Sequence, residues 1–413
     1  KQNKPDKQGL ALGACPTFWL LYLSLATVSG EFLSFQWDTL LLETGLVAMA
    51  VAPWTLVHRP GKGDPPPLSR WLLWWLLFRL MFAAGLVKLA SGDPLWSGLT
   101  ALAVHYETQP IPTPIGWYAH HLPAWFHTAS TATVLGVELT VPWLIFAPRR
   151  LRHAACAVLM ALQLLIALTG NYTFFNLLTV ALALTLLDDE VWPRRLRVAR
   201  AAALATEGLR DRSWAPASLV AAILTIVTVP MTTGMLASQA GLTAPWHAAL
   251  RPARRALAPF RSVNTYGLFA VMTSRRPEII VEGSSDGTSW KAYEFKYKPG
   301  DVRRAPPWVA PHQPRLDWQM WFAAFDRPED NPWFERLCRR LLEGAPAVLD
   351  LLAVNPFPDA PPRFVRATLF EYHIASLERS RAEGVWWTRE EAGPYAPTFS
   401  RQPTALVSSP LDR

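Results

Sequence analysis

The stretch WLLWWLLFRLMFAAGLVKLASGDP, residues 71–94, places two cations inside an apolar run that is long enough to cross a lipid bilayer. Arg79 lies near the middle of this run and Lys88 lies near its end. A charge at membrane depth is costly and is seldom left without a partner. We therefore expect acidic side chains on neighbouring helices, and Glu43 and Glu138 lie in two other apolar segments.

The composition is typical of a membrane protein. Of the 413 residues, 51% are hydrophobic and 20 are tryptophan, a richer apolar and aromatic content than that of ordinary soluble domains. The net charge of +8 indicates less about a partner than the position of the cations along the chain. Cys15, Cys156 and Cys338 form no CxxC pair, which argues against thiol exchange as an activity.

Seven apolar runs of about the length of a membrane span indicate a polytopic all-α bundle over residues 1–240. They cover residues 14–33, 39–57, 71–90, 124–147, 152–169, 171–188 and 216–238. The chain begins at Lys1 rather than at Met, so seven is a minimum, and no cleavable signal is predicted before the first run.

Lys and Arg alternate between the links that connect these runs. They occur in the N-terminal tail and in links 58–70, 148–153 and 189–215, and are missing from links 34–38 and 91–123 and from the turn at 170. By the positive-inside rule the basic links are cytosolic. Residues 91–123 and everything after about residue 239 are then predicted to face away from the cytosol.

Counting depth along the helices predicts which charges pair. At about 1.5 Å per residue, Arg79 lies about 12 Å from the cytosolic start of its segment, and Glu138 lies about 13 Å from the cytosolic end of its own. Lys88 and Glu43 both lie within two turns of the outer face. We therefore expect the pairs Arg79–Glu138 and Lys88–Glu43, which either hold the bundle together or line a polar active pocket.

The outer link 91–123 has the residues of an interfacial loop, because it combines aromatic side chains with prolines that forbid one continuous helix. We expect it to lie along the membrane surface as two short amphipathic pieces. Its polar and aromatic residues are His105, Tyr106, Glu107, Trp117, Tyr118, His120 and His121. The spacing of the three histidines and Glu107 matches no zinc motif, so neither a metal nor another cofactor is predicted.

The chain changes character after Pro245. Residues 241–263 have the composition of a basic amphipathic connector on the membrane. Residues 264–378 form a soluble α+β domain in which sheet dominates, with a hairpin around Asp286-Gly287, a helix that starts after Asn331 and a strand over 363–376. In the second strand of the hairpin, we expect Tyr293, Phe295 and Tyr297 to face one way, and Glu294, Lys296 and Lys298 to face the other. Residues 379–413 are polar, Pro-rich and without periodicity, which predicts a disordered tail.

Four aromatic residues of the soluble domain repeat at helical spacing: Trp318, Trp321, Phe322 and Phe325. They pack into the core of the domain, or they form an exposed patch that binds a client protein. The sequence leaves both interpretations open.

Six runs in both halves of the chain resemble the lipase maturation factor family, in the same order. They are FLSFQWDTLLLETGL (32–46), WLLFRLMFAAGLVKLASGDPLW (75–96), HYETQPIPTPIGWYAHHLP (105–123), NTYGLFAVMTSRRPEIIVEGSSDGTSWKAYEFKYKPGD (264–301), APHQPRLDWQMWFAAF (310–325) and NPFPDAPPRFVRA (355–367). The resemblance implies a multi-pass membrane protein that helps secreted lipases to fold and assemble, and that engages them with its non-cytosolic C-terminal domain. It implies the endoplasmic reticulum membrane in animals. In a bacterium, which the Arg-rich composition favours, the location would be the inner membrane.

A second hypothesis is a membrane-embedded enzyme. Lys88 with His105 and His120 would form an acid–base pocket, in an arrangement that resembles the membrane domain of vitamin K-dependent carboxylases. The chain carries no nucleophile, nucleotide or metal signature, which favours the folding factor over the enzyme. The expected partners are lipase-like client proteins and the bilayer, and no nucleic acid.

Overall fold

The computed structural model describes residues 14–52, 65–192, 215–242 and 245–401, and these form two compact units. The helical unit contains residues up to 103, residues 123–167 and residues 172–272. The C-terminal unit contains residues 104–122, 168–171 and those from 273 onward. Two short pieces that lie among the helical segments in sequence therefore belong to the C-terminal unit.

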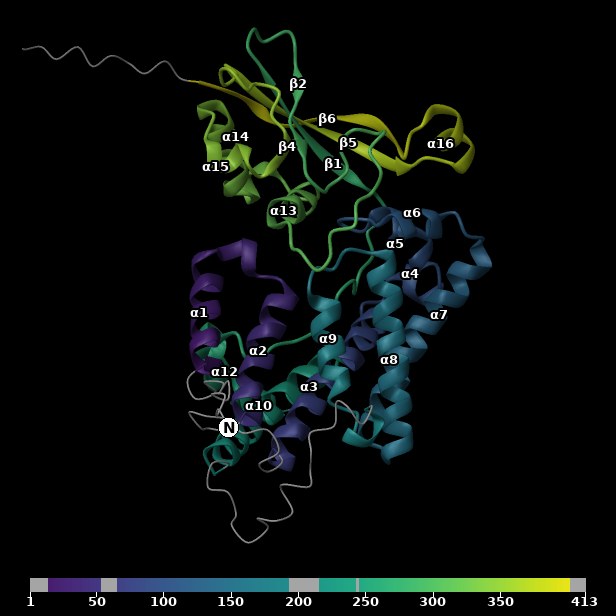
Figure 1. Cartoon of the computed structure of the whole chain (residues 1–413), viewed down its shortest axis with the longest axis vertical. Helices are drawn as coiled ribbons and strands as arrows, with labels where there is room; N and C mark the ends of the chain where they lie inside the picture. Colours follow the sequence, from purple (N-terminus) through teal and green to yellow (C-terminus); the bar gives the residue numbers. More distant parts are fainter. Residues whose placement is uncertain (1–13, 53–64, 193–214, 243–244, 402–413) are drawn as a thin grey trace, which may run out of the picture. The chain divides into compact units, whose positions relative to one another are not determined.

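The helical unit consists of helices joined by short turns (Figure 1). Its main elements are α1 (Ala14–Val28), η1 (Gly30–Leu33), α2 (Gln36–Val51), α3 (Pro67–Ala90), α4 (Pro94–Ser97), α7 (Ala124–Thr140), η2 (Val141–Phe146), α8 (Arg149–Thr169), α9 (Phe175–Leu184), η3 (Asp189–Val191), α10 (Ala215–Gln239), α11 (Pro245–Ala249), α12 (Arg251–Leu257) and η7 (Ala258–Phe260). Helix α5 (Ala101–Thr108) begins in this unit and ends in the other.

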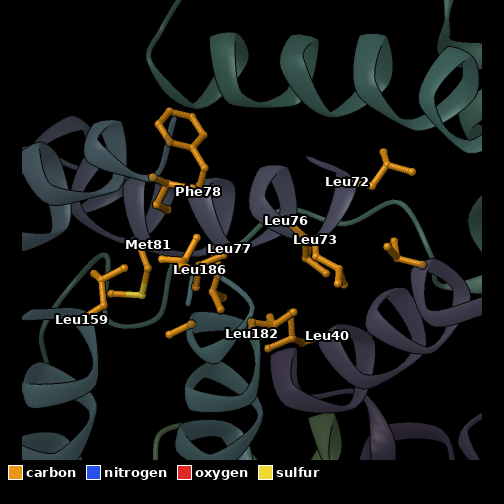
Figure 2. Close-up of a cluster of buried hydrophobic side chains, with 14 of the residues drawn as sticks. Leu40, Leu72, Leu73, Leu76, Leu77, Phe78, Met81, Leu159, Leu182 and Leu186 are labelled. Carbon is orange, nitrogen blue, oxygen red and sulfur yellow. The ribbon is translucent and has the colours of Figure 1, made fainter. Parts of the chain in front are cut away.

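Helix α3 is the centre of the helical unit, because it packs against α2, α7, α9 and α10. Figure 2 shows its leucines meeting side chains from the surrounding helices, such as Leu40 of α2, Leu159 of α8 and Leu182 of α9. Twelve of the 24 residues of α3 are buried, so this helix is shielded on several sides. Its sequence is apolar around most of its circumference for that reason.

Within the described residues, four helices are long and apolar enough to cross a membrane: Pro67–Ala90, Ala124–Phe146, Arg149–Thr169 and Ala215–Gln239. The other three predicted spans are also helical, but α1, α2 and α9 have 15, 16 and 10 residues. A straight crossing takes about 20 residues. The structure thus shows a helical membrane region with four such spans, and the count of seven stays a prediction.

The C-terminal unit is built on a four-stranded sheet with the order β2-β1-β5-β6 (Figure 1). The strands are β1 (Pro277–Ser284), β2 (Lys291–Ala292), β5 (Phe364–Ile374) and β6 (Trp387–Ser400), and neighbours are antiparallel. Strands β3 (Glu294–Phe295) and β4 (Leu352–Val354) form a second, two-stranded sheet. The helical elements are α6 (Pro114–His120), α13 (Arg315–Ala323), η8 (Pro328–Asp330), α14 (Pro332–Glu343), α15 (Pro346–Leu349) and α16 (Leu377–Glu383).

One predicted boundary of the C-terminal region is wrong, and another differs from the division of the structure into compact units. Residues 264–272 lie in the helical unit, and the C-terminal unit starts at Thr273. The predicted tail is ordered as far as residue 401, because α16 and the 14-residue strand β6 follow β5, whose whole length pairs with β6. Strand β6 was missed because its alternation is weak, with Glu390 and Glu391 on exposed positions and prolines in its second half. Residues 402–413 lie outside the described residues.

Local signals correctly predicted one helix and one turn of the C-terminal unit. Helix α14 begins after Asn331 and ends at Gly344, whose φ of 68° is left-handed, and it buries the predicted apolar face. The turn at Asp286 forms as expected, because its carboxylate accepts hydrogen bonds from the backbone N–H groups of Thr288 and Ser289 at 2.7 Å. The prediction that Lys296 and Lys298 share one side is wrong, because Lys296 is exposed and Lys298 is buried.

Candidate functional site

The four charged residues of the membrane segments form two buried ion pairs, with partners exchanged relative to the prediction. Arg79 binds Glu43, and Lys88 binds Glu138 with Nζ–Oε distances of 2.8 and 3.0 Å. All four side chains are at most 7% exposed. The expected pairs Arg79–Glu138 and Lys88–Glu43 are therefore wrong, although each charge does have a partner.

The exchange has a steric cause at Gly85 of α3. A Cβ atom at this position would lie 3.0 Å from the Cβ of Glu138, so α7 makes its close approach to α3 here. Lys88 is one turn further along α3, which places Glu138 beside Lys88 instead of Arg79. Depth counting treats helices as parallel rods and cannot locate such a crossing point.

Glu43 also binds a segment that lies more than 200 residues later in the chain. Its Oε2 accepts hydrogen bonds from Tyr266 Oη at 2.7 Å and from Asn264 Nδ2 at 3.0 Å. Arg79 donates to the carbonyl oxygen of Asn264 at 3.1 Å, and its guanidinium lies over the Tyr266 ring. The Glu43–Arg79 pair is thus one half of a four-residue polar centre.

Residues 264–272, here called the returning segment, run back through the helical unit from this centre. The backbone N–H of Met272 donates to Asp93 at 2.6 Å, and Trp96 donates to the carbonyl oxygen of Phe269 at 2.9 Å. Gly267 adopts a φ of 141° where a Cβ would collide with Val87 of α3, so only glycine fits there. The sequence predicted that this segment belongs to the soluble domain. The sequence of the segment does not reveal that its hydrogen-bond partners lie in the helical unit.

The polar centre has no room for a substrate. Arg79, Thr232, Gln239 and Tyr266 help to line a pocket that can hold roughly one water molecule. The ion pairs, the hydrogen bonds and the small pocket together favour the structural interpretation of these charges. They hold α2, α3, α7 and the returning segment together.

The residues of the hypothetical acid–base pocket do not form a site within either unit. Lys88 belongs to the helical unit, where it binds Glu138 and lies over the Trp96 ring. His105 and His120 belong to the C-terminal unit. His120 Nε2 is 3.9 Å from Oε2 of Glu107, a carboxylate that also accepts a hydrogen bond from the backbone N–H of Ile374 at 2.9 Å.

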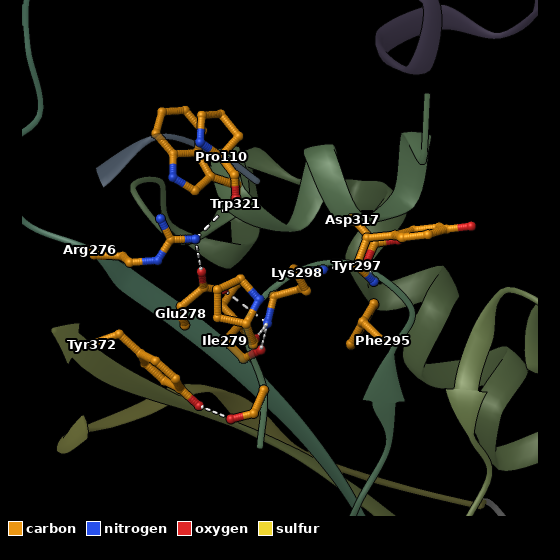
Figure 3. Close-up of polar contacts among 12 residues, drawn as sticks. Pro110, Arg276, Glu278, Ile279, Phe295, Tyr297, Lys298, Asp317, Trp321 and Tyr372 are labelled. Atoms are coloured by element: carbon orange, nitrogen blue, oxygen red, sulfur yellow. Dashed lines mark hydrogen bonds and ion pairs between the residues drawn. The ribbon is translucent and has the colours of Figure 1, made fainter. Parts of the chain in front are cut away.

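The C-terminal unit has a buried charge cluster of its own, formed by Arg276, Glu278 and Lys298 (Figure 3). Glu278 binds Arg276 at 2.8 Å and Lys298 at 3.0 Å, and none of the three side chains is more than 1% exposed. Burial lowers the pKa of the Arg276 guanidinium, and the charge of Glu278 opposes that shift. Lys298 also donates to the carbonyl oxygens of Ile279 and Pro299.

Arg276 attaches the outer link to the sheet. Its guanidinium donates to the backbone carbonyl oxygens of Glu107, Gln109 and Pro110, and Trp321 of α13 donates to the carbonyl oxygen of Thr108. Residues 91–123 were predicted to be an interfacial loop of the helical domain. The structure assigns residues 104–122 of this loop to the C-terminal unit, and their position along the membrane surface stays a prediction.

Asn171 is a second connecting residue that sequence reasoning did not identify. Its Nδ2 donates to the carbonyl oxygens of Ile111, Pro112 and Pro307, and its Oδ1 accepts from the N–H groups of Val309 and Ala310. Asn171 begins an Asn-Tyr-Thr glycosylation sequon, but this fully used, buried amide is unavailable to a glycosyltransferase in the folded protein.

The four aromatic residues around α13 divide between core and surface. Trp318 and Trp321 are buried, while Phe322 and Phe325 are exposed. The Trp321 ring contacts both phenylalanine rings, with centroid distances of 4.9 and 4.8 Å. The core interpretation therefore holds for the two tryptophans, whereas the two phenylalanines are exposed. That they bind a client protein stays a prediction.

The thiol of Cys338 is not suited to exchange chemistry. It lies on the buried face of α14, and burial, with a smaller contribution from the charge of Glu335, raises its pKa to about 12. The thiolate is the reactive species, so native protein at about pH 8 should leave Cys338 unmodified by iodoacetamide. Mass spectrometry should find this cysteine alkylated only after denaturation. Native labelling as fast as that of a small free thiol would contradict the burial.

Among the residues that the structure describes, no group of three or more His, Cys, Asp or Glu side chains could hold a metal ion. Two family models match the chain. Residues 9–194 match the model of the lipase maturation factor transmembrane domain, and residues 262–397 match that of the lipase maturation factor C-terminal domain. The chain belongs to the lipase maturation factor family.

Individual relatives align along nearly the whole chain. Lipase maturation factor 2 of Gallus gallus is 38% identical over 482 aligned residues, which cover 92% of this chain and 67% of the relative. The Homo sapiens factor 2 is 37% identical over 486 residues, with 92% and 68% covered. Lipase maturation factor 1 of Bos taurus is 38% identical over 410 residues, with 93% and 71% covered. No solved structure matches the chain.

These relatives are named as maturation factors and not as enzymes. The family's C-terminal domain starts at residue 262 of this chain, before the C-terminal unit itself begins at Thr273. The first part of that lipase maturation factor domain is therefore the returning segment, which contacts the helical unit.

Proposed function

We propose that this chain is a multi-pass membrane folding factor that assists the folding and assembly of secreted lipases or similar hydrolases through its C-terminal unit. Membership of the lipase maturation factor family carries the proposal. The buried cations Arg79 and Lys88 of the helical unit, and Arg276 and Lys298 of the C-terminal unit, each bind a carboxylate of their own unit, which supports a structural role for these charges.

The proposed topology has seven spans, with the C-terminal unit on the non-cytosolic side. The four long apolar helices account for four crossings, and α1, α2 and α9 would supply three shorter ones. The alternation of Lys and Arg between the links supports this odd number. The membrane would be the endoplasmic reticulum in an animal cell and the inner membrane in a bacterium.

The proposed client surface is the outer side of α13, at Phe322 and Phe325. Exposed aromatic side chains are costly in water and are enriched at protein interfaces. The buried Trp321 ring packs against the rings of both phenylalanines, and this packing restricts their motion. A rigid aromatic surface loses little conformational entropy when it binds an unfolded or partly assembled protein.

The test is the double variant Phe322→Ser/Phe325→Ser of the full chain, co-expressed with a secreted lipase. We expect at least about tenfold less lipase to co-purify, because both side chains lose their contact area. The yield of active secreted lipase should fall with it. The thermal unfolding of the variant should stay close to that of the unmodified chain, since neither side chain is buried.

Leu351→Ser is the matched control, because Leu351 is an exposed apolar residue of the same unit that lies in the turn between α15 and β4. It should leave lipase capture unchanged. Equal loss in control and double variant would indicate non-specific stickiness, and undiminished capture by the double variant would remove α13 as the client surface.

A further inference from the structure

Helix α6 of the C-terminal unit has one buried and one exposed apolar side. Ile115, Tyr118 and Leu122 are exposed and recur at a spacing of three and four residues, so they lie on one side of the helix and the turn after it. Tyr118 is 56% exposed. We call these three residues the α6 stripe.

The opposite side of α6 is built into the unit. Trp117 is buried in the cluster with Ile280, Tyr372 and Trp387, and its indole donates to the carbonyl oxygen of Trp386 at 2.8 Å. His121 Nε2 lies 3.0 Å from the carbonyl oxygen of Ala375. Because these contacts fix the rotation of α6, the stripe is held outward. Tyr118 also makes edge contacts with the rings of Trp117 and Trp386, at centroid distances of 5.0 and 6.2 Å, which hold its ring in place.

The position of α6 in the chain brings this stripe to a membrane. Leu122 precedes by two residues the start of Ala124–Phe146, one of the helices long and apolar enough to span a bilayer. At most about 3.6 Å per residue separates them, so the end of α6 cannot leave the surface that this span enters. Trp125, the second residue of the span, is 70% exposed, as is typical of an aromatic anchor at an interface.

The charge pattern fits the same surface. Residues 91–123 contain no Lys or Arg. The two acidic residues of this link turn inward, because Asp93 accepts from Leu95 and Met272, and Glu107 accepts from Ile374. The outward side of α6 is therefore apolar and aromatic with one phenolic hydroxyl, which suits the boundary between acyl chains and headgroups.

We infer that the α6 stripe inserts into the lipid interface on the non-cytosolic surface of the bilayer, as a membrane contact of the C-terminal unit itself. The partner is the lipid itself, recognised by apolar burial without phosphate-binding cations. This contact is independent of which proteins the α13 surface binds.

The experiment places an environment-sensitive NBD fluorophore at Tyr118 through Tyr118→Cys, in the full chain in phosphatidylcholine nanodiscs. Cys15 is changed to Ser in every sample to limit background labelling. The matched control carries the fluorophore through Ser289→Cys, an exposed polar position at the β1–β2 turn. Each sample is quenched by phosphatidylcholine with a nitroxide near the carbonyl end of its acyl chains, and separately by aqueous iodide.

We expect the nitroxide lipid to remove most of the fluorescence at position 118 and almost none at position 289, with iodide acting in the reverse order. Equal iodide quenching at both positions, without lipid quenching at 118, would overturn the inference. Shielding at 118 that requires an added lipase, with the nitroxide lipid having no effect, would also overturn it and make the stripe a protein-binding surface. Ile115→Cys gives an independent second reading if labelling at 118 disturbs α6.

Discussion

Replacing Glu43 with glutamine should destabilise the helical unit by about 3–5 kcal/mol, the usual cost of removing one partner from a buried ion pair. Arg79 would keep its charge in a site that is 4% exposed. Asn264 and Tyr266 would lose the charged acceptor of their hydrogen bonds. The full chain in detergent is unfolded with increasing denaturant, and the loss of its helical circular dichroism signal measures the free energy of unfolding.

Exchange variants control for this interpretation. Arg79→Glu combined with Glu43→Arg should recover part of the stability that either single change removes, since the pair re-forms with opposite polarity. Arg79→Glu combined with Glu138→Arg should recover nothing, because these residues bind different partners. Recovery in the second double variant and not in the first would show that the depth-based pairing was correct after all.

The second large effect is expected in the C-terminal unit, at Glu278. Glu278→Gln leaves Arg276 and Lys298 as two buried cations without a carboxylate, and should also cost about 3–5 kcal/mol. The loss should loosen the outer link, because Arg276 holds the carbonyl oxygens of Glu107, Gln109 and Pro110. Limited proteolysis of the full chain at rising temperature should then cut the C-terminal unit many degrees earlier than in the unmodified protein.

Glu282→Gln is the matched control for this change. Glu282 lies on the same strand, β1, and accepts a hydrogen bond from Arg366 at 2.8 Å, but this pair is partly exposed to water. A pair of that kind contributes about 1 kcal/mol or less. Similar losses in the two variants would mean that the buried cluster adds no more stability than a surface pair.

Much of the architecture was predictable from the chain alone where the signal is local. The apolar length of residues 71–90 predicted α3, and the cap at Asn331 with the glycine at 344 predicted both ends of α14. The cost of a buried charge also predicted that Arg79 and Lys88 would each have an acidic partner. In these cases the cause lies within one helix or in the transfer of one side chain from water.

Predictions that needed two distant pieces of chain failed or were never made. Strand β6 is stable because β5 pairs along its length, and its own alternation did not reveal it. The same holds for Asn171, which only the folded chain brings to the loop at 307–310. The split of α13 into buried tryptophans and exposed phenylalanines depends on which side of the helix the sheet covers.

By itself the sequence determined that this chain crosses a membrane, that its helical region is followed by a sheet-bearing unit, and that its buried cations must be neutralised. Only the tertiary structure decided which carboxylate neutralises which cation, and that residues 264–272 return to the helical unit while residues 104–122 join the other. The physical reason is that burial and capping act over a few neighbouring residues, whereas pairing depends on where helices and strands cross in space.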